Sequence, residues 1–461
     1  MPPTVFPTGV TIYEPERCWN GYTIFQPRQL GATLIDMNGN VVNRWRGLQG
    51  LPGPNKLLPG GYVMGSIGQR DMKLGFQDNL DLVQVDWDGR TVWRFDRLEL
   101  VKDPRRVARW LARQHHDYQR EGNPVGYFVP GMAPTVDRGK TLIVCHANLN
   151  HPAISDKRLL DDVIIEVAWD GRIIWRWQCS DHFEELGFGP AARRVLRRDP
   201  GMVKAGGGMG DWMHLNSASW LGPNKWFDAG DERFHPDNII WSGRETNILA
   251  ITGRKSGHIV WQVGPDYLNN KTGKKIGQII GPHHVHMIPR GLPGEGDILV
   301  FDNGGWAGYG ARSPGAPTGR RNALRDSSRV LQFSPVTLAP VWQYPERKEG
   351  PGFGPISGPL YSPLMSSAQR LPNGNTLITE GNTGRIFEVT GKGEIVWEYI
   401  NPYYGRKDRQ NIIYRAYRVP YEWVPQAERF HETPVSRAAN ARFRVRGSPK
   451  PRVFKVTDTR R

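Results

Sequence analysis

Histidines are the residues whose spacing in this chain points most clearly to chemistry. The sequence has 12 histidines, and seven of them fall in four short segments beside predicted strands: His115, His116, His146, His214, His283, His284 and His286. Imidazoles gathered in a protein interior are costly unless they bind a metal ion, an anion or a substrate. These segments are therefore candidates for one shared site.

Other polar and aromatic residues lie close to the same segments. The planar fork of Arg244 suits a tetrahedral oxyanion, although pairing with a carboxylate between blades is the alternative. Asp302 and Glu380 could serve as acids, bases or metal ligands, but Asp-Asn-Gly also caps turns. Trp212 and Trp306 are candidates to stack on an aromatic substrate, or else to fill the core.

The elements that must position these residues come from an internal repeat. A strand, a tight turn and a second strand ending near Trp recur six times, at 34–45, 82–95, 164–177, 248–263, 330–344 and 386–399. Alternating apolar residues around Asp-Gly or Asn-Gly are typical of β-hairpins. A second hairpin type, clearest at Gln369–Thr379, falls between the copies. Two hairpins per repeat predict an all-β, six-bladed β-propeller.

The chain ends suggest how the ring closes. The repeats begin and end on an outer hairpin, so the missing inner strand is expected from Asn411–Pro420, which would pair with the N-terminal strand and remove exposed edges. We therefore expect an N-terminal extension over 1–20, the propeller over 21–420 and a basic tail over 421–461. Insertions at 102–114, 146–161, 182–212 and 224–236 are expected over one face, with helices at 105–113 and 193–198.

Propeller geometry brings the histidines together. The innermost strand of each blade lines the channel, so the starts of these strands converge on one end, and the second strands return to that end. Aligning the hairpins puts six of the seven histidines at inner-strand starts, and puts His146, Arg244, Asp302–Asn303 and Glu380 at second-strand ends. The predicted site draws on three consecutive blades and is lopsided within the channel.

At these residues the sequence resembles the bacterial arylsulfotransferases that need no nucleotide sulfate donor. The motifs that carry the resemblance are HHDYQ, DWMHLNS, the Ser-Gly-Arg at 242–244, HHVHMIP with ILVFDNG, and QRLPNGNTLI. The resemblance implies a six-bladed propeller that moves a sulfuryl group between phenols through a sulfated histidine, without a cofactor. It implies His283 as the nucleophile, with His116, His214, Asn216 and Arg244 holding the sulfate and assisting the leaving phenolate. Trp212, Trp306 and His146 are expected to contact the substrate.

Two other functions stay open from the residues. The first is a metal enzyme: a lyase, hydrolase or oxygenase that acts on a small aromatic or organic molecule. Its Fe, Cu, Mn or Zn ion could be held by His116, His214, His283, His146 and Glu380. The histidines beyond those of the family pattern favour this alternative, and Arg244 disfavours it. A binding propeller without chemistry is the third alternative, and the clustered histidines argue against it.

The composition narrows the kinds of binding partner and the cellular location that we expect for the protein. Lys+Arg 61 against Asp+Glu 45 gives a net charge of +16, which suits an anionic small molecule, while much of the excess lies in solvated stretches and is weak evidence for nucleic acid. Three cysteines give no disulfide framework or CxxC site. The N-terminus lacks a signal-peptide pattern and no apolar run could span a membrane, so we expect a cytoplasmic protein. The sequence is compatible with an oligomer.

Overall fold

The fold is a six-bladed β-propeller in a computed structural model that describes residues 8–48, 53–70, 77–103, 105–201, 210–267, 273–346, 360–405 and 409–437. Blade one comprises β29 (Ala416–Val419), β2 (Tyr22–Phe25), β3 (Ala32–Ile35) and β4 (Val41–Trp45). Blade two comprises β5 (Lys56–Leu58), β6 (Tyr62–Gly65), β7 (Leu82–Val85) and β8 (Thr91–Phe95). Blade three comprises β11 (Gln114–Arg120), β12 (Thr141–Leu149), β13 (Leu159–Val167) and β14 (Ile173–Gln178).

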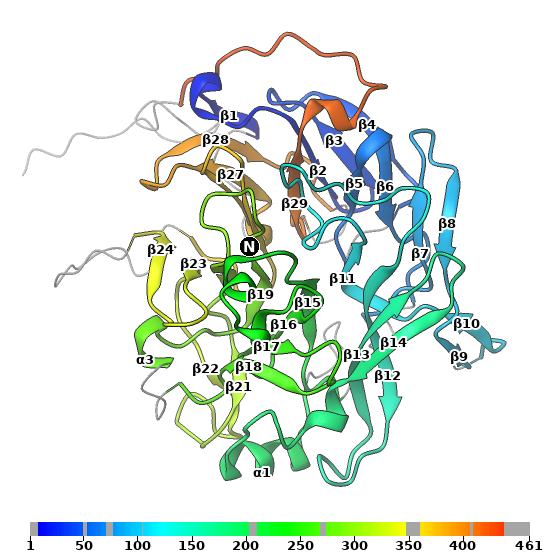
Figure 1. The fold of residues 1–461 in the computed structure, drawn as a ribbon, viewed down its shortest axis with the longest axis vertical. Helices are drawn as coiled ribbons and strands as arrows, with labels where there is room; N and C mark the ends of the chain where they lie inside the picture. Colours follow the sequence, from blue (N-terminus) through cyan, green and yellow to red (C-terminus); the bar gives the residue numbers. More distant parts are fainter. Residues whose placement is uncertain are drawn as a thin grey trace, which may run out of the picture.

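The remaining blades continue in chain order (Figure 1). Blade four comprises β15 (Leu215–Trp220), β16 (Ile239–Gly243), β17 (Ile248–Thr252) and β18 (Ile259–Val263). Blade five comprises β19 (Pro282–Met287), β20 (Ile298–Asp302), β23 (Arg329–Phe333) and β24 (Pro340–Tyr344). Blade six comprises β25 (Ser367–Arg370), β26 (Thr376–Glu380), β27 (Arg385–Val389) and β28 (Ile395–Ile400), with β1 (Gly9–Tyr13) as a fifth strand.

The tryptophan that ends each repeat joins its blade to the next one. In every blade the indole Nε1 on the outermost repeat strand donates to a backbone oxygen in the outer turn of the following blade. The six bonds, 2.8–3.0 Å long, are Trp45 to Asp86, Trp93 to Trp169, Trp177 to Gly257, Trp261 to Pro335, Trp342 to Gly391 and Trp397 to Met37. The sixth bond returns to blade one, so the repeated Trp stabilises a closed ring of contacts.

The pairing of the two ends of the chain confirms the predicted closure. The strand β29 pairs antiparallel with β2, from Tyr22 opposite Val419 to Phe25 opposite Ala416, and Figure 1 shows β29 beside the blue N-terminal strands. The guanidinium of Arg418, on this strand, is fully buried and lies 2.9 Å from Glu388 of blade six. Two further contacts join the ends: β1 pairs with β28, and Val435 bridges to Tyr13.

The insertions contain little helix. The helix expected at 193–198 is present as part of α1 (Pro190–Arg198). The prediction of a helix at 105–113 is wrong, because β10 (Arg109–Leu111) pairs there with β9 (Glu99–Val101). The alternation of Trp110, half exposed, and Leu111, buried, fits a strand with one exposed and one buried side.

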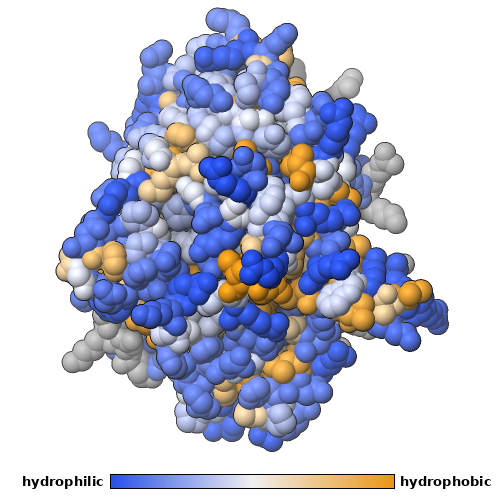
Figure 2. Space-filling view, turned by 45° about the vertical axis from the view of Figure 1, so that its right-hand side comes forward, coloured by the Kyte–Doolittle hydropathy of each residue, from blue (hydrophilic) through white to orange (hydrophobic). Residues whose placement is uncertain are grey.

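Short elements complete the structure. In the described part of the chain the other helices are η1 (Pro15–Arg17), η2 (Pro59–Gly61), η4 (Cys179–His182), α2 (Lys225–Asp228), η5 (Glu232–Phe234), α3 (Gly273–Ile276), η6 (Gly381–Thr383) and η7 (Tyr421–Trp423). A second small hairpin joins β21 (Ala307–Tyr309) to β22 (Arg320–Ala323). No helix among the described residues is long and apolar enough to cross a membrane. The face in Figure 2 is mostly hydrophilic with small apolar patches. The basic tail expected over 421–461 lies outside the described residues from 438 onward, as does most of the glycine-rich segment before Asp211.

Candidate active site

The inner strands of blades three, four and five begin with the same backbone irregularity. His116, His214 and His284 adopt positive φ angles of 59°, 53° and 52°. The strand pairing shifts register around His116 and His284, and between Leu215 and Ser217 directly after His214. A non-glycine residue in this region costs about 1–3 kcal/mol and persists only where surrounding contacts impose it. Such bulges re-aim side chains, so the backbone holds three imidazoles at one end of the channel in a strained conformation.

His116 and His214 meet across the boundary between blades three and four. Their rings lie 4.6 Å apart at 75°, and the ring of Tyr414, just before β29, lies 5.7 Å from His116. Both imidazoles are almost completely buried. Burial, reinforced by the neighbouring His214, holds the pKa of His116 well below its usual range, so this ring is neutral.

His214 differs from its neighbours because it has a carboxylate partner. Its Nδ1 lies 2.6 Å from Oδ2 of the buried Asp211. Burial alone would lower the pKa of His214, but the charge and hydrogen bond of Asp211 outweigh burial and raise that pKa above its ordinary value of 6.5. The same contact lowers the pKa of Asp211 despite its burial. The pair therefore favours an imidazolium whose Nε2 remains to exchange a proton.

His283 is held in one tautomer. Its Nδ1 lies 2.7 Å from Oδ1 of Asn303 and 3.2 Å from the carbonyl oxygen of Gly281. The amide of Asn303 is oriented because its Nδ2 donates to the carbonyls of Ser362 and Met365. Two acceptors on Nδ1 require the proton there. Burial, followed by the charges of Arg244 and Arg415, holds the pKa of His283 well below its usual range, so Nε2 carries a free lone pair.

Arg244 is buried beside these rings. It follows β16, and its guanidinium pairs with Glu245 and donates weakly to the carbonyl of Pro363, at 3.4 Å. Its charge lowers the pKa of His283 and opposes the rise in the pKa of His214, so it acts on both rings. Arg244 therefore has a carboxylate partner, but this is the adjacent residue Glu245 and not the carboxylate between blades that the sequence suggested.

Asn216 links blades four and five. Its Nδ2 donates to the carbonyl of Pro282 at 2.6 Å, and its Oδ1 accepts from Ser242 at 2.9 Å. Both ends of the amide are therefore engaged by protein groups. The bond to Pro282 fixes the backbone immediately before His283.

A second group of ligand atoms lies toward the outside of blade three. His115 Nε2 lies 3.0 Å from Asp162 Oδ1, His146 Nε2 lies 3.8 Å from the same oxygen, and the two imidazoles stack at 3.6 Å. All three residues are completely buried. Burial and the neighbouring His146 lower the pKa of His115 to about 4. His115 also touches the first group, since its Nδ1 lies 2.7 Å from Nδ1 of His116.

The last two histidines lie one step further along β19. His286 Nε2 lies 2.9 Å from the hydroxyl of Tyr127, and His284 Nε2 lies 3.5 Å from that of Tyr417. Burial lowers the pKa of both imidazoles, that of His286 to about 4. Beside them, Arg415 lies 3.1 Å from Asp117.

Asp117 also binds a lysine and so balances two buried cations. Lys56 Nζ lies 2.7 Å from its Oδ1. Burial lowers the pKa of Lys56 to about 8, against the opposing charge of Asp117. Lys56, Asp117 and Arg415 therefore form one buried network of charges.

Three other predicted residues lie apart from the histidine cluster. Trp212 is completely buried in a core cluster with Phe183 and Phe188, and its indole donates to Asp161. Trp306 is 41% exposed. Glu380 pairs with Arg385 at 3.3 Å and accepts the backbone N–H of Tyr361.

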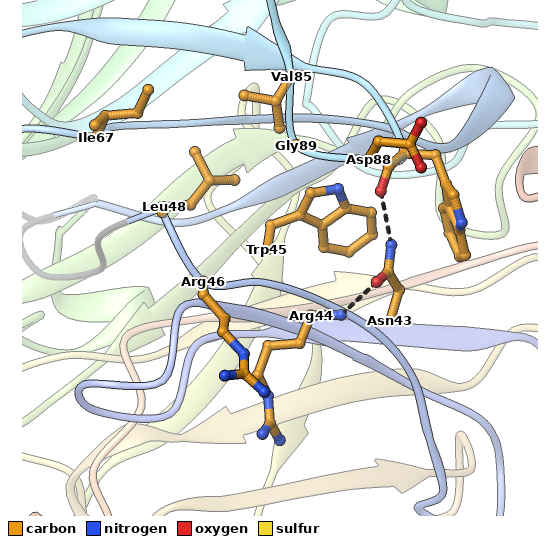
Figure 3. A pocket seen from close by; sticks show the side chains of 11 residues that line it. Asn43, Arg44, Trp45, Arg46, Leu48, Ile67, Val85, Asp88 and Gly89 are labelled. Atoms are coloured by element: carbon orange, nitrogen blue, oxygen red, sulfur yellow. Dashed lines mark hydrogen bonds between the residues drawn. The ribbon is translucent and has the colours of Figure 1, made fainter.

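A surface pocket elsewhere contains none of the histidines. It has a volume of about 440 Å³ and lies between the outer strands of blades one and two, around Trp45, Leu48 and Trp87 (Figure 3). Asn43 donates to the carbonyl of Trp87 at its edge. This pocket is a groove between neighbouring blades.

Two residues important to the site could not be assigned a role from the sequence. Asp211 stands three residues before His214, but nothing in the strand pattern links them. Asp162 lies inside β13, directly opposite His146 in the register. Acidic residues inside a strand that is buried along its whole length are a usable signal, because such residues need partners.

Comparisons with solved structures and with curated proteins give only distant similarities. Solved structures with a similar backbone path include a protein of unknown function from Bacteroides caccae, with 11% identity and a TM-score of 0.43, covering 87% of this chain and 100% of that one. Virginiamycin B lyase from Staphylococcus aureus follows at 10% identity and a TM-score of 0.34, covering 86% of this chain and 84% of that one. No curated protein matches the sequence.

The family model is the informative match. The model of the arylsulfotransferases (ASST) matches residues 133–407, which is more than half of the chain. The matched part includes His214, Asn216, Arg244 and His283, whereas His116 lies before it. The chain therefore belongs to the arylsulfotransferase family.

Proposed function

We propose that this protein transfers the sulfuryl group of an aryl sulfate to a phenolic acceptor through Nε2 of His283. The observation that carries the proposal is the bond between Nδ1 of His283 and Asn303. It keeps the proton on Nδ1, so the nucleophilic nitrogen is Nε2. The low pKa of this imidazole keeps it neutral at pH 7, as a nucleophile must be.

In the first half-reaction, Nε2 of His283 bonds to sulfur while the bond between sulfur and the aryl oxygen breaks. The imidazolium of His214, held by Asp211, gives its proton to the departing aryl oxide. In the second half-reaction a phenol returns a proton to His214, its oxygen bonds to sulfur, and the nitrogen–sulfur bond breaks. Proton transfer of this kind contributes about 10²–10⁴-fold to rate.

The sulfuryl oxygens need cationic and hydrogen-bonding partners during transfer. Arg244 supplies the fixed charge, because its pair with Glu245 uses one side of the fork and leaves donors on the other. His116, neutral and next to His214, supplies a further hydrogen bond. Asn216 acts as a positioning residue, since its amide is used to hold Pro282.

The substrate class follows from the surroundings of the site. Tyr414 borders His116, and its ring can stack on an aryl group. Buried cations favour an anionic donor over a neutral one. A small aromatic sulfate ester is therefore the proposed donor, with no cofactor required at His283.

The direct test is turnover of nitrophenyl sulfate, followed as nitrophenolate release with and without added phenol. The proposal expects release that depends on the phenol and is abolished in His283→Asn. His258→Asn is the matched control, because His258 is exposed on the outside of the ring. If the wild type turns over none of several aryl sulfates, so that His283→Asn has no activity to lose, the propeller binds small molecules without this chemistry.

A further inference from the structure

We propose that His115, His146 and Asp162 of blade three bind one divalent transition-metal ion, best matched by zinc, behind the sulfuryl-transfer site. These residues come from three adjacent strands, β11, β12 and β13. His146 lies directly opposite Asp162 in the strand register. The proposal does not depend on the sulfuryl-transfer reaction, because metal content is measured without substrate.

The charge balance of Asp162 calls for a cation. Its Oδ2 accepts the backbone N–H of Leu215 at 3.0 Å, whereas its Oδ1 is buried without a hydrogen-bond partner among the described residues. Its ion-pair neighbours in that part of the chain are the imidazoles of His115 and His146 alone. A buried carboxylate without a compensating cation is strongly unfavourable, and a metal ion would supply the missing charge.

The ligand atoms are also free and suitably spaced. Neither ring nitrogen of His146 makes a hydrogen bond among the described residues, although the side chain is fully buried. The two nitrogen–oxygen separations of 3.0 and 3.8 Å bracket the roughly 3.4 Å that separates two ligand atoms around a tetrahedral ion with bonds of about 2.0–2.2 Å. All three ligand atoms lie within 4.8 Å of one another. Two nitrogens and one carboxylate oxygen favour zinc or a similar ion over calcium or magnesium.

The surroundings resemble the outer shell of a metal site. The other ring nitrogen of His146, Nδ1, faces Asp78 at 3.8 Å, and a carboxylate behind a ligating histidine is a common arrangement. Arg113 pairs with Asp78 at 2.8 Å, so that carboxylate is already neutralised. Asp162 is left as the anionic ligand.

The ion would act on the transfer site through one hydrogen bond. A metal on Nε2 of His115 leaves the proton of this neutral ring on Nδ1, which then donates to Nδ1 of His116, 2.7 Å away. His116 must then carry its own proton on Nε2. The metal would thus turn His116 into a hydrogen-bond donor, which suits the binding of sulfuryl oxygens.

The test is metal analysis of the full chain, unfolded with a chelator and refolded with and without zinc. We expect about one zinc per chain by plasma mass spectrometry and a higher midpoint of thermal unfolding with zinc. Asp162→Asn and His146→Gln should each lose the metal and the rise in midpoint. Two substitutions are used because either one alone could impair folding, which circular dichroism checks.

Two control variants separate this site from other histidine groups. His258→Asn tests the exposed group of His182, Glu185 and His258, the second place where three ligand atoms lie within 4.8 Å among the described residues. His283→Asn tests a metal at the channel axis. Both should retain zinc. Absence of zinc from the refolded wild type, retention of zinc in Asp162→Asn and His146→Gln, or its loss in either control would overturn the proposal.

Discussion

Oδ1 of Asn303 lies 2.7 Å from Nδ1 of His283. His283 lies in β19, and Asn303 directly follows β20, the neighbouring strand of blade five. The amide is itself held by two backbone carbonyls, so it can present only its oxygen to the ring. This relationship determines which nitrogen of His283 is free to react.

Replacing Asn303 by Ala should therefore reduce kcat more than it changes KM. Nδ1 would keep only the more distant carbonyl of Gly281, at 3.2 Å, so the reactive tautomer would be less populated. We expect kcat to fall by about 10- to 100-fold, less than for complete loss of a tautomer-fixing partner. Asn375→Ala, a buried amide in blade six that bonds to Glu388, is the control for general loss of packing. An unchanged kcat in Asn303→Ala would contradict the role given to this amide.

The pH profile should have an alkaline limb set by His214. The folded pKa of this imidazole is above 6.5, so its proton, and with it the activity, is present below that pKa and is lost as pH rises through it. Asp211→Asn removes the main group that raises the pKa, while Arg244 still opposes protonation and Glu245 still favours it. The limb in kcat/KM should consequently move to lower pH. A limb that stays in place would show that another group titrates.

Arg244→Met should remove the fixed positive charge from the site. Loss of one preorganised charged donor costs about 10²–10³-fold in kcat in comparable sites, and Arg244→Lys should recover only part of this because an ammonium lacks the planar fork. The measurement is steady-state turnover of nitrophenyl sulfate. Arg290→Met, an exposed arginine paired with Asp228, should leave turnover unchanged. Equal turnover in Arg244→Met and wild type would exclude Arg244 from the reaction.

The ring of tryptophan contacts predicts a graded effect on stability. Trp397→Phe breaks the contact from blade six to blade one and leaves the carbonyl of Met37 buried without its donor, which should lower the free energy of unfolding by about 1–3 kcal/mol. Trp342→Phe makes the same change at an exposed contact, where water can replace the indole. Its effect should be smaller, and denaturant titration compares the two. A larger loss of unfolding free energy in Trp342→Phe than in Trp397→Phe would argue against burial as the cause.

The fold was predictable because each repeat contains a local sequence pattern that is typical of a hairpin. Alternation around Asp-Gly indicates a hairpin from a few residues, and six copies determine the number of blades. The fifth strand β1 and the pair β9–β10 were not predicted, because such added strands depend on contacts with residues far away in the chain. Residues 105–113 look helical from their arginines, but the pairing of Trp110 opposite Leu100 prevails over that local preference.

The sequence predicted where the histidines of the site lie, but not which residues they contact. Strand starts and ends placed His116, His214 and His283 near one another, because propeller geometry forces this convergence. The sequence could not show that His214 pairs with Asp211, since a contact three residues away depends on the strained backbone at His214. Nor could it separate His115 from His116, adjacent residues that contact different neighbours because of the bulge in β11.

The most direct test of the central claim is mass spectrometry of the protein after incubation with an aryl sulfate and no acceptor. We expect the mass gain of one SO₃ group on the peptide that contains His283, no such gain in His283→Asn, and loss of the gained mass when a phenol is added. Turnover without any such adduct, or an adduct on a residue other than His283, would contradict the central claim.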